Sequence, residues 1–430
     1  MRPPQSTYAT DNFPNHKIPF ATTEQYVENT LQDNQLTLEK PPAKTTPAAS
    51  PIRDLICFSH LRWDFVFQRP QHLMTRAAQG WRVFFVEEPV FSEDLALATF
   101  RERHEGRLHV ITPHLPATLA PEQIRQEQQN LVDTLVKQYE ITDYVCWYYT
   151  PMALAFSQHL EPKVAVYDCM DELSAFKGAP PELIEWENDL FGAADVVFTG
   201  GVSLYEAKRE RHPNAHAFPS SIEREHFAKA KQSVDEPEDQ RRIGSPKMGF
   251  YGVVDERFDL DLLRELSNRR PDWHFVIIGP VVKIDALSLP QNLNIHYLGM
   301  KTYDQLPAYL SGWTVALLLF ARNESTRFIS PTKTPEYLAA GKPVVSTPIR
   351  DVVHPYGESG LVHIAESPDE FEAAIEKAMQ MAGNTEWQEN VDGFLSTNSW
   401  DLTWQRMKSL LEEQAHATAS RNAAESQPIR

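Results

Sequence analysis

Lys333 and Glu336 stand three residues apart in the stretch SPTKTPEYLAAGKPVV, which spans residues 330–345. Residues at this spacing share one face of a helix, so the ammonium group and the carboxylate are predicted to lie together. A lysine in the first helical turn opposes the helix dipole unless an anion neutralises it. With free backbone N–H groups it could hold a diphosphate, while Glu336 could accept hydrogen bonds from a ribose diol. The alternative is a solvated ion pair worth only tenths of a kcal/mol.

The element predicted to carry these residues is a short helix between two buried strands. Ser330 is predicted as its N-cap, Pro331 as its first residue and Gly341 as its exit. The flanking runs TVALLLF and VVS are continuously apolar, which is typical of parallel strands covered on both faces. Ligands of such sheets bind outside the carboxyl ends of the strands. The loop at 321–329 and Ser330 are therefore predicted to line an anion site.

A second group of polar residues follows strands in the first half of the chain. Asp168, Asp171 and Glu172 are concentrated in the segment YDCMDE, just where a predicted strand ends. Neighbouring carboxylates raise one another's pKa, which suits a group that deprotonates or orients an acceptor hydroxyl. The alternative is helix capping in a solvated turn. Gln68 and Arg69 stand at the entrance of a helix that follows the first strand, at the same edge of the sheet.

Composition bounds the class of protein. The chain has 430 residues, 42% of them hydrophobic, and is long enough for two domains. Its 41 basic and 59 acidic residues give a net charge of -18, which argues against nucleic acid and against broad electrostatic attachment to anionic membranes. No apolar run approaches the length of a membrane span, and the N-terminus lacks an apolar signal core, so a cytoplasmic protein is predicted. Cys57, Cys146 and Cys169 have no metal-ligand spacing and are predicted to be buried free thiols.

The stretch around Lys333 resembles a known signature. It is similar to the nucleotide-sugar motif of retaining glycosyltransferases with the GT-B fold, of the family 4 or group 1 type. The residues that carry the resemblance are Ser330, Pro331, Lys333, Glu336, Tyr337, Leu338, Ala339, Ala340, Gly341 and Pro343. The resemblance implies that Glu336 binds the nucleotide ribose. The family often carries a second glutamate eight positions upstream for the donor sugar, where this chain has Phe328; Glu324 would replace it only if its loop folds back.

The resemblance also implies a cationic clamp for the donor phosphates. Related enzymes carry an arginine just past the glycine that corresponds to Gly252, and a lysine a few residues on. This chain has Val253 at the arginine position, while Arg257 falls near the lysine position. Arg327 offers a second cation, because a guanidinium fork suits a diphosphate. For both arginines the alternative is an ordinary surface charge.

The predicted fold class is α/β, with two Rossmann-like doubly wound parallel-sheet domains of GT-B type and a C-terminal helix that crosses back. The charged, turn-rich segment before Lys247 is interpreted as the linker. The predicted divisions are a disordered or loosely docked leader (1–51), an acceptor domain (52–232), the linker (233–246), a donor domain (247–385), a crossover helix region (386–414) and a flexible tail (415–430).

The resemblance implies that a sugar is transferred from a nucleoside-diphosphate sugar to a hydroxyl group, with retention of the anomeric configuration. UDP-sugars are the favoured donors, and the acceptor is expected to be a carbohydrate or a lipid-linked sugar. The segment YDCMDE, and the residues QRP that open the helix after the first strand, resemble those of a bacterial subgroup that makes teichuronic acid and other cell-surface polysaccharides. A peripheral position at the inner face of the membrane would be compatible with that role. Lys333, Asp168 and Asp171 are the candidate catalytic residues. No metal or other cofactor is demanded, because cations already cover the phosphates. The alternatives are a GT-B epimerase or hydrolase, and a non-catalytic GT-B scaffold.

Overall fold

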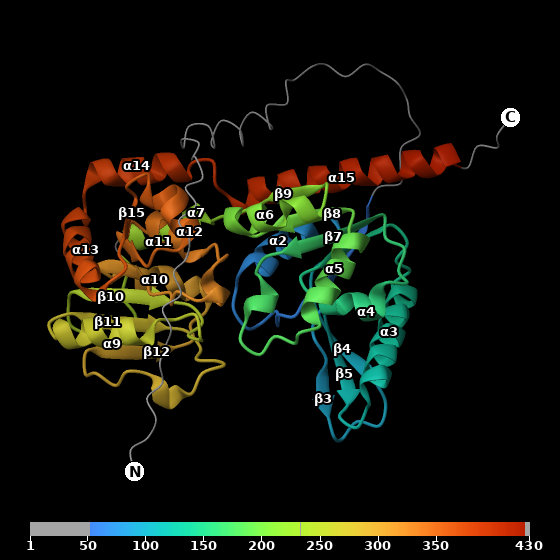
Figure 1. The fold of residues 1–430 in the computed structure, drawn as a ribbon, viewed down its shortest axis with the longest axis horizontal. Coiled ribbons are helices and arrows are strands. Elements are labelled where there is room, and N and C mark those ends of the chain that lie inside the picture. The colour runs from blue at the N-terminus through green and yellow to red at the C-terminus, as the bar shows by residue number, and fades with distance from the viewer. Residues whose placement is uncertain (1–51, 233, 426–430) are drawn as a thin grey trace, which may run out of the picture. The chain divides into compact units, whose positions relative to one another are not determined.

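The structure is a computed structural model that describes residues 52–232 and 234–425. Every described residue belongs to one compact unit. The predicted leader, 1–51, lies outside the described residues. Within them, the chain builds two separate sheets, one of nine strands and one of six (Figure 1).

The first sheet has the order β3-β5-β2-β1-β6-β7-β8-β9, and β4 pairs with β5. All its pairs are parallel except β4 with β5. Its strands are β1 (Asp54–Phe58), β2 (Arg82–Val86), β3 (Val90–Ser92), β4 (Thr99–Glu105), β5 (Leu108–Pro116), β6 (Tyr144–Tyr148), β7 (Val164–Cys169), β8 (Val196–Thr199) and β9 (Ala215–Ala217). The helices between them are α2 (Arg69–Gly80), α3 (Pro121–Gln138), α4 (Leu154–Ser157), α5 (Leu183–Ala193) and α6 (Val202–Lys208). Helix α7 (Arg224–Ala228) follows β9, and its Phe227 packs in the core that contains α10 and α11.

The second sheet is entirely parallel, in the order β12-β11-β10-β13-β14-β15. This is the strand order of a dinucleotide-type doubly wound sheet, with its switch point between β10 and β13. Its strands are β10 (Lys247–Tyr251), β11 (His274–Ile278), β12 (Ile295–Gly299), β13 (Val315–Leu318), β14 (Val344–Ser346) and β15 (Val362–Ile364). Its helices are α8 (Glu238–Arg241), α9 (Leu260–Arg269), α10 (Leu306–Ser311), α11 (Lys333–Ala339), α12 (Arg350–Val352) and α13 (Pro368–Met381).

Both faces of the second sheet are covered by helices, which explains its continuously apolar strands. Along β11, Phe275 and Ile277 join the core cluster that contains α9 and α13, while Val276 and Ile278 join the cluster that contains α10 and α11. Successive side chains of a strand point to opposite faces, so a strand buried on both sides must be apolar throughout.

The C-terminal helices link the two cores. Helix α14 (Thr385–Leu395) contributes Trp387 to the core that contains α10 and α11. Helix α15 (Trp400–Glu425) places Trp400 and Trp404 in the core of the first sheet, beside α2. The chain therefore crosses from one core to the other at residues 396–399, so the expected C-terminal helix is present.

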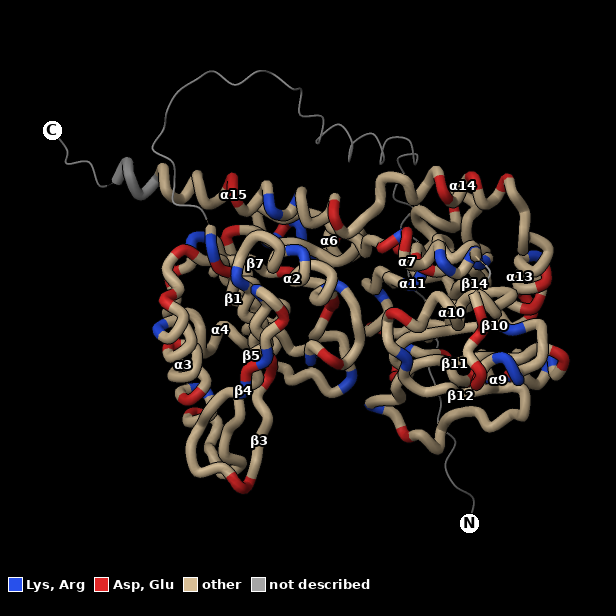
Figure 2. Tube along the Cα trace, turned by 180° about the vertical axis from the view of Figure 1, so that it is seen from behind, with Lys and Arg blue, Asp and Glu red and all other residues tan. Residues whose placement is uncertain are grey.

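Three local features of the structure were not expected from the sequence. The tail predicted as flexible from residue 415 is helical as far as Glu425, since α15 continues. The predicted linker contains α8, and its buried Gln240 hydrogen-bonds the Tyr309 carbonyl and the Trp313 indole of the second core. Strand β4 was not expected, because its residues TFRERHE are mostly charged. Figure 2 shows these charges along β4, and Figure 1 shows β3, β4 and β5 together.

Two expectations from composition are tested by the structure. Cys57, Cys146 and Cys169 are free and buried, as predicted. Among the described helices, none combines the length and apolarity needed to cross a membrane.

Candidate active site

The switch point of the second sheet brings the predicted donor residues together. Tyr251 ends β10, Gly252 follows it, and Lys333 is the first residue of α11. The Lys333 amino group lies over two aromatic rings of the same region, 5.8 Å from the centre of Phe250 and 6.0 Å from that of Phe320. Cation–π contacts of this kind hold an ammonium group in place without neutralising it.

Lys333 is partly buried and has no hydrogen bond or ion pair with any residue in 52–232 or 234–425. Burial lowers the pKa of Lys333; the carboxylate of Glu336 opposes that effect, and the nearby Arg257 guanidinium adds to it. Two neighbouring positive charges, one of which has no ion-pair partner among the described residues, create a local potential that favours a bound anion. The position of Lys333 in the first helical turn likewise predicts an anion at this place.

The absence of a side chain at Gly252 makes room for Lys333. The backbone φ at Gly252 is +139°, a conformation that other residues rarely adopt. A Cβ atom built there would lie 2.2 Å from Lys333 Cε and 2.8 Å from Lys333 Nζ. Glycine is therefore required at this position by both the backbone and the lysine.

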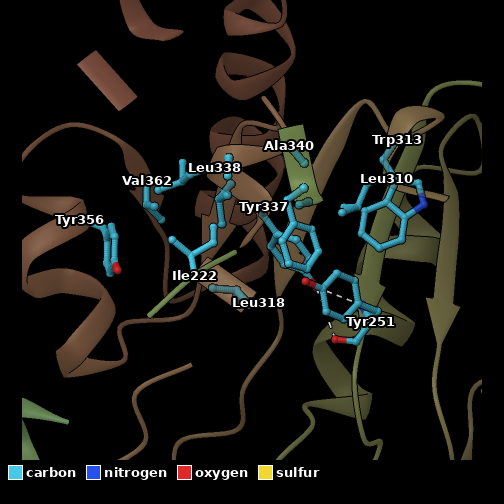
Figure 3. Packing of buried hydrophobic residues seen from close by; sticks show 14 of the residues in the cluster. Ile222, Tyr251, Leu310, Trp313, Leu318, Tyr337, Leu338, Ala340, Tyr356 and Val362 are labelled. Carbon is cyan, nitrogen blue, oxygen red and sulfur yellow. Dashed lines mark hydrogen bonds between the residues drawn. The ribbon is translucent and has the colours of Figure 1, made fainter. Parts of the chain in front are cut away.

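Glu336 is buried on the same helix, and Tyr251 donates a hydrogen bond from its hydroxyl to Glu336 Oε2. Burial raises the pKa of Glu336, while the Tyr251 hydroxyl and Lys333 act in the opposite direction. Helix α11 is fixed below by an aromatic core, in which the Tyr251 backbone N–H donates to the Tyr337 hydroxyl at 3.0 Å (Figure 3). Tyr251 thus holds one oxygen of Glu336, and the other oxygen has no hydrogen-bond donor within residues 52–232 and 234–425.

Arg257 lies beside this group and is oriented by a carboxylate that sequence analysis did not single out. Its Nε and Nη2 donate to Asp255 at 3.0 and 2.7 Å, and its guanidinium lies 5.1 Å from the Phe176 ring centre. The side chain is only 25% exposed. Its Nη1 has no hydrogen-bond partner among the described residues, so one edge of the fork remains available to an anion.

Of the three carboxylates predicted near the acceptor, only Asp171 is free of a partner within the described part of the chain. Burial raises the pKa of Asp171, while Arg257 and Lys333 of the other sheet lower it. Asp168 accepts from Arg69 through both oxygens, at 2.8 to 3.1 Å. Glu172 pairs with Lys208 at 2.6 Å. Asp171 therefore has no ion-pair partner among the described residues, whereas Asp168 and Glu172 are each held in an ion pair.

Gln68 and Arg69 have a structural role at the start of α2. The Gln68 backbone N–H donates to Gln71 Oε1 at 3.0 Å. Arg69 is 3% exposed, and besides Asp168 it binds the Phe218 carbonyl at 2.7 Å. A buried ion pair of this geometry leaves neither partner free for an acceptor. Neither Gln68 nor Arg69 contacts the Lys333 group through a hydrogen bond.

Two predicted donor residues are placed differently from the expectation. Ser330 does not cap α11: Thr332 occupies the N-cap position, and the Ser330 carbonyl accepts from Ser220 Oγ at 2.9 Å. Arg327 is 64% exposed and pairs with Glu324 at 3.6 Å, so it is a surface charge. Phe328, at the position where relatives carry a glutamate, packs against the apolar core of the first sheet.

A group of polar residues that was not predicted lies at the switch point of the first sheet, between β1 and β6. His60 follows β1, and Tyr149 and Thr150 follow β6. His60 Nδ1, the Tyr149 hydroxyl and Thr150 Oγ1 are buried polar atoms without a hydrogen-bond partner among the described residues. The pKa of His60 is lowered to about 4, chiefly by burial; a hydrogen bond with the Tyr149 backbone opposes this shift, and the charge of Lys283 contributes to it. The position of these residues after parallel strands was the signal that could have found them.

Comparison with known proteins gives an independent view of these elements. Residues 249–381 match the family model described as "Glycosyl transferases group 1", which covers β10 to α13. A putative teichuronic acid biosynthesis glycosyltransferase, TuaH of Bacillus subtilis strain 168, is 24% identical over 320 residues, which are 68% of this chain and 78% of that protein.

Solved structures with the same architecture include a sucrose-phosphate synthase from Thermosynechococcus elongatus, with TM-score 0.64, 12% identity and coverage of 85% of this chain and 100% of that one. A structure from E. coli described as trehalose-6-phosphate bound with UDP-2-fluoro glucose has TM-score 0.62 and 12% identity, and the match covers 84% of this chain and 99% of that one. A trehalose-phosphate synthase from Burkholderia xenovorans in complex with glucose-6-phosphate has TM-score 0.63 and 12% identity, and the match covers 84% of this chain and 100% of that one. The predicted GT-B fold, with two parallel-sheet α/β domains, is confirmed.

Proposed function

We propose that this protein is a glycosyltransferase that moves a sugar from a nucleoside-diphosphate sugar to a hydroxyl acceptor. The observation that carries the proposal is the Lys333 amino group, which has no ion-pair partner in the described part of the chain and lies beside the Arg257 guanidinium at the switch point of a doubly wound sheet. The family match over this same sheet and the similarity to TuaH support a glycosyltransferase.

The two cations would act on the leaving group. As the bond between the sugar and the diphosphate breaks, negative charge grows on the phosphate oxygens. Lys333 and the free Nη1 edge of Arg257 would stabilise that charge with little reorganisation, since aromatic rings and Asp255 already hold them. Glu336 would accept hydrogen bonds from the ribose hydroxyls through its unused oxygen. Gly252 keeps the space for Lys333 open.

Asp171 is the proposed acceptor-side carboxylate. It is the one of the three predicted there that has no ion-pair partner in the described residues, and burial raises its pKa toward the range of a general base. It would accept the proton of the attacking hydroxyl or orient that hydroxyl. Asp168, held by Arg69, keeps a structural role in this proposal.

The finer features of the proposal come from relatives. Retention is proposed from the resemblance to retaining enzymes of the group 1 type. A UDP-sugar is favoured because a structural neighbour is bound with UDP-2-fluoro glucose. A carbohydrate or lipid-linked acceptor, used on the cytoplasmic side of the membrane, is proposed from the sequence resemblance to the bacterial subgroup. The similarity to TuaH, a putative teichuronic acid biosynthesis glycosyltransferase, supports an acceptor of the cell-surface polysaccharide type.

The experiment is an assay of nucleoside-diphosphate release from UDP-sugars with and without candidate acceptors. We expect release to depend on acceptor, and Asp171→Asn to lower turnover at least tenfold without weakening UDP binding. Glu172→Gln, which alters a neighbouring carboxylate already paired with Lys208, is the matched control and should retain turnover. Release that is independent of acceptor would favour a hydrolase, and full activity of Asp171→Asn would refute its role.

A further inference from the structure

The antiparallel pair of β4 and β5 gathers two imidazoles and a carboxylate. The strands are joined by the two-residue loop Gly106-Arg107, with φ of +64° at the glycine. Register places His104 directly opposite His109, and Glu102 lies two residues before His104 on the same strand. Because alternate residues of a strand share a face, all three side chains are on one side of the sheet.

The donor atoms of these side chains converge. His109 Nδ1 lies 2.7 Å from Glu102 Oε1, and His104 Nε2 lies 3.2 Å from the same oxygen. One ligand atom from each of the three residues lies within 4.8 Å of both others. In a tetrahedral zinc site with bonds of about 2.0 to 2.1 Å, ligand atoms are roughly 3.3 Å apart. The three groups are therefore close to the separation that one such ion requires.

The surroundings hold the carboxylate and one imidazole in position. The Tyr139 hydroxyl, at the C-terminal end of α3, lies 2.6 Å from both oxygens of Glu102 and donates its proton to them. The His109 ring packs 4.7 Å from Phe84 and 5.1 Å from Tyr139, and its side chain is 10% exposed. Outer hydrogen bonds of this kind orient metal ligands. His104 is 53% exposed, which gives an ion a way in and leaves a coordination position for water.

We propose that Glu102, His104 and His109 bind a divalent transition-metal ion of the zinc type. Two nitrogen donors and one carboxylate suit zinc and its neighbours, whereas calcium and magnesium prefer sites made of oxygen alone. Carboxylate and imidazole ligands bind when deprotonated, so occupation would replace the hydrogen bonds of Glu102 with the two imidazoles.

The role of this site would be structural. Strand β4 lies at the edge of the first sheet and is separated from β1 by β5 and β2, so it is roughly 14 Å across the sheet from β1. Its mostly charged residues bury little apolar surface, so the edge strand gains little from packing. An ion that joins His104 of β4 to His109 of β5 would fasten this strand to the sheet, and the Tyr139 contact would extend the link to α3.

The test uses the full chain, freed of metal by a chelator. Zn²⁺ is titrated calorimetrically, and Co²⁺ is added as a spectroscopic probe, since its visible absorption reports coordination geometry. The variants are His104→Ala, which alters an exposed ligand and should fold, and Glu102→Gln, which preserves the shape of the carboxylate. The control is His159→Ala, because His159 also pairs with a carboxylate, Asp133, at 2.6 Å but belongs to no three-ligand group among the described residues.

We expect one ion per chain, and a rise in the unfolding temperature of the wild type when Zn²⁺ is added. His104→Ala and Glu102→Gln should each weaken Zn²⁺ binding tenfold or more and lose the Co²⁺ spectrum, while His159→Ala should bind like the wild type. Absence of binding to the wild type, or any smaller loss in His104→Ala, would overturn the proposal. The latter result would mean that the ion binds elsewhere on the chain.

Discussion

Replacement of Gly252 by alanine tests the geometry of the proposed donor site. The new Cβ would lie 2.2 Å from Lys333 Cε, whereas unstrained carbon atoms stay about 3.5 to 4.0 Å apart, so the lysine must move by roughly 1.5 Å. If its ammonium group retreats from about 2.8 to about 4.3 Å from a phosphate oxygen, the Coulomb attraction at an effective dielectric constant of about 20 falls by about 2 kcal/mol. We therefore expect Gly252→Ala to weaken nucleoside-diphosphate binding roughly 30-fold.

The assay for this variant is calorimetric titration of UDP, with the unfolding temperature measured alongside. The backbone φ of +139° adds strain at Gly252, so a matched control is Gly360→Ala, where φ is +68° and no atom lies within 4 Å of the new Cβ. Gly360→Ala should lose stability but retain affinity. If folded Gly252→Ala binds UDP as tightly as the wild type, the placement of Lys333 at the phosphates is wrong.

Two further variants test the supporting contacts. Burial raises the pKa of Glu336 and the Tyr251 hydroxyl lowers it, so nucleotide affinity should increase as pH rises through that pKa. In Tyr251→Phe the midpoint of this pH dependence should move to higher pH, because the hydroxyl that stabilises the carboxylate is lost. An unmoved midpoint would exclude the contact. Arg69→Met leaves the Asp168 carboxylate buried and unpaired, which should cost about 3 to 5 kcal/mol of unfolding free energy. Denaturant unfolding should show partial recovery in the double variant with Asp168→Asn, and a loss below about 1 kcal/mol would refute the structural role.

The two-sheet fold was predictable because its strands follow a simple rule. Runs such as the one that forms β13 are apolar at every position, since helices cover both faces. Strand β4 escaped prediction for the opposite reason: its residues are charged and mostly exposed, and it forms because β5 offers a free edge. The extension of α15 beyond Ala415 is similarly polar, so no hydrophobic period marked it.

The candidate site was partly predictable. Helix position alone indicated that Lys333 and Glu336 share a face, and the structure brings both to the switch point. The N-cap prediction at Ser330 was wrong: the helix begins three residues later, and the Ser330 carbonyl accepts a hydrogen bond from Ser220, which is 110 positions away in the sequence. The contrast between Asp171 and Asp168 also depends on a distant residue, Arg69, which no local pattern reveals.

The most direct test of the central claim is calorimetric titration of UDP, GDP and ADP into the wild type and into Lys333→Met. Lys408→Met, which alters a lysine on α15 paired with Glu412, is the control. We predict that UDP binds the wild type and the control alike, and that Lys333→Met weakens it tenfold or more, which is about 1.4 kcal/mol. If no nucleotide binds the wild type, or if Lys333→Met binds UDP equally well, the proposed donor site is contradicted.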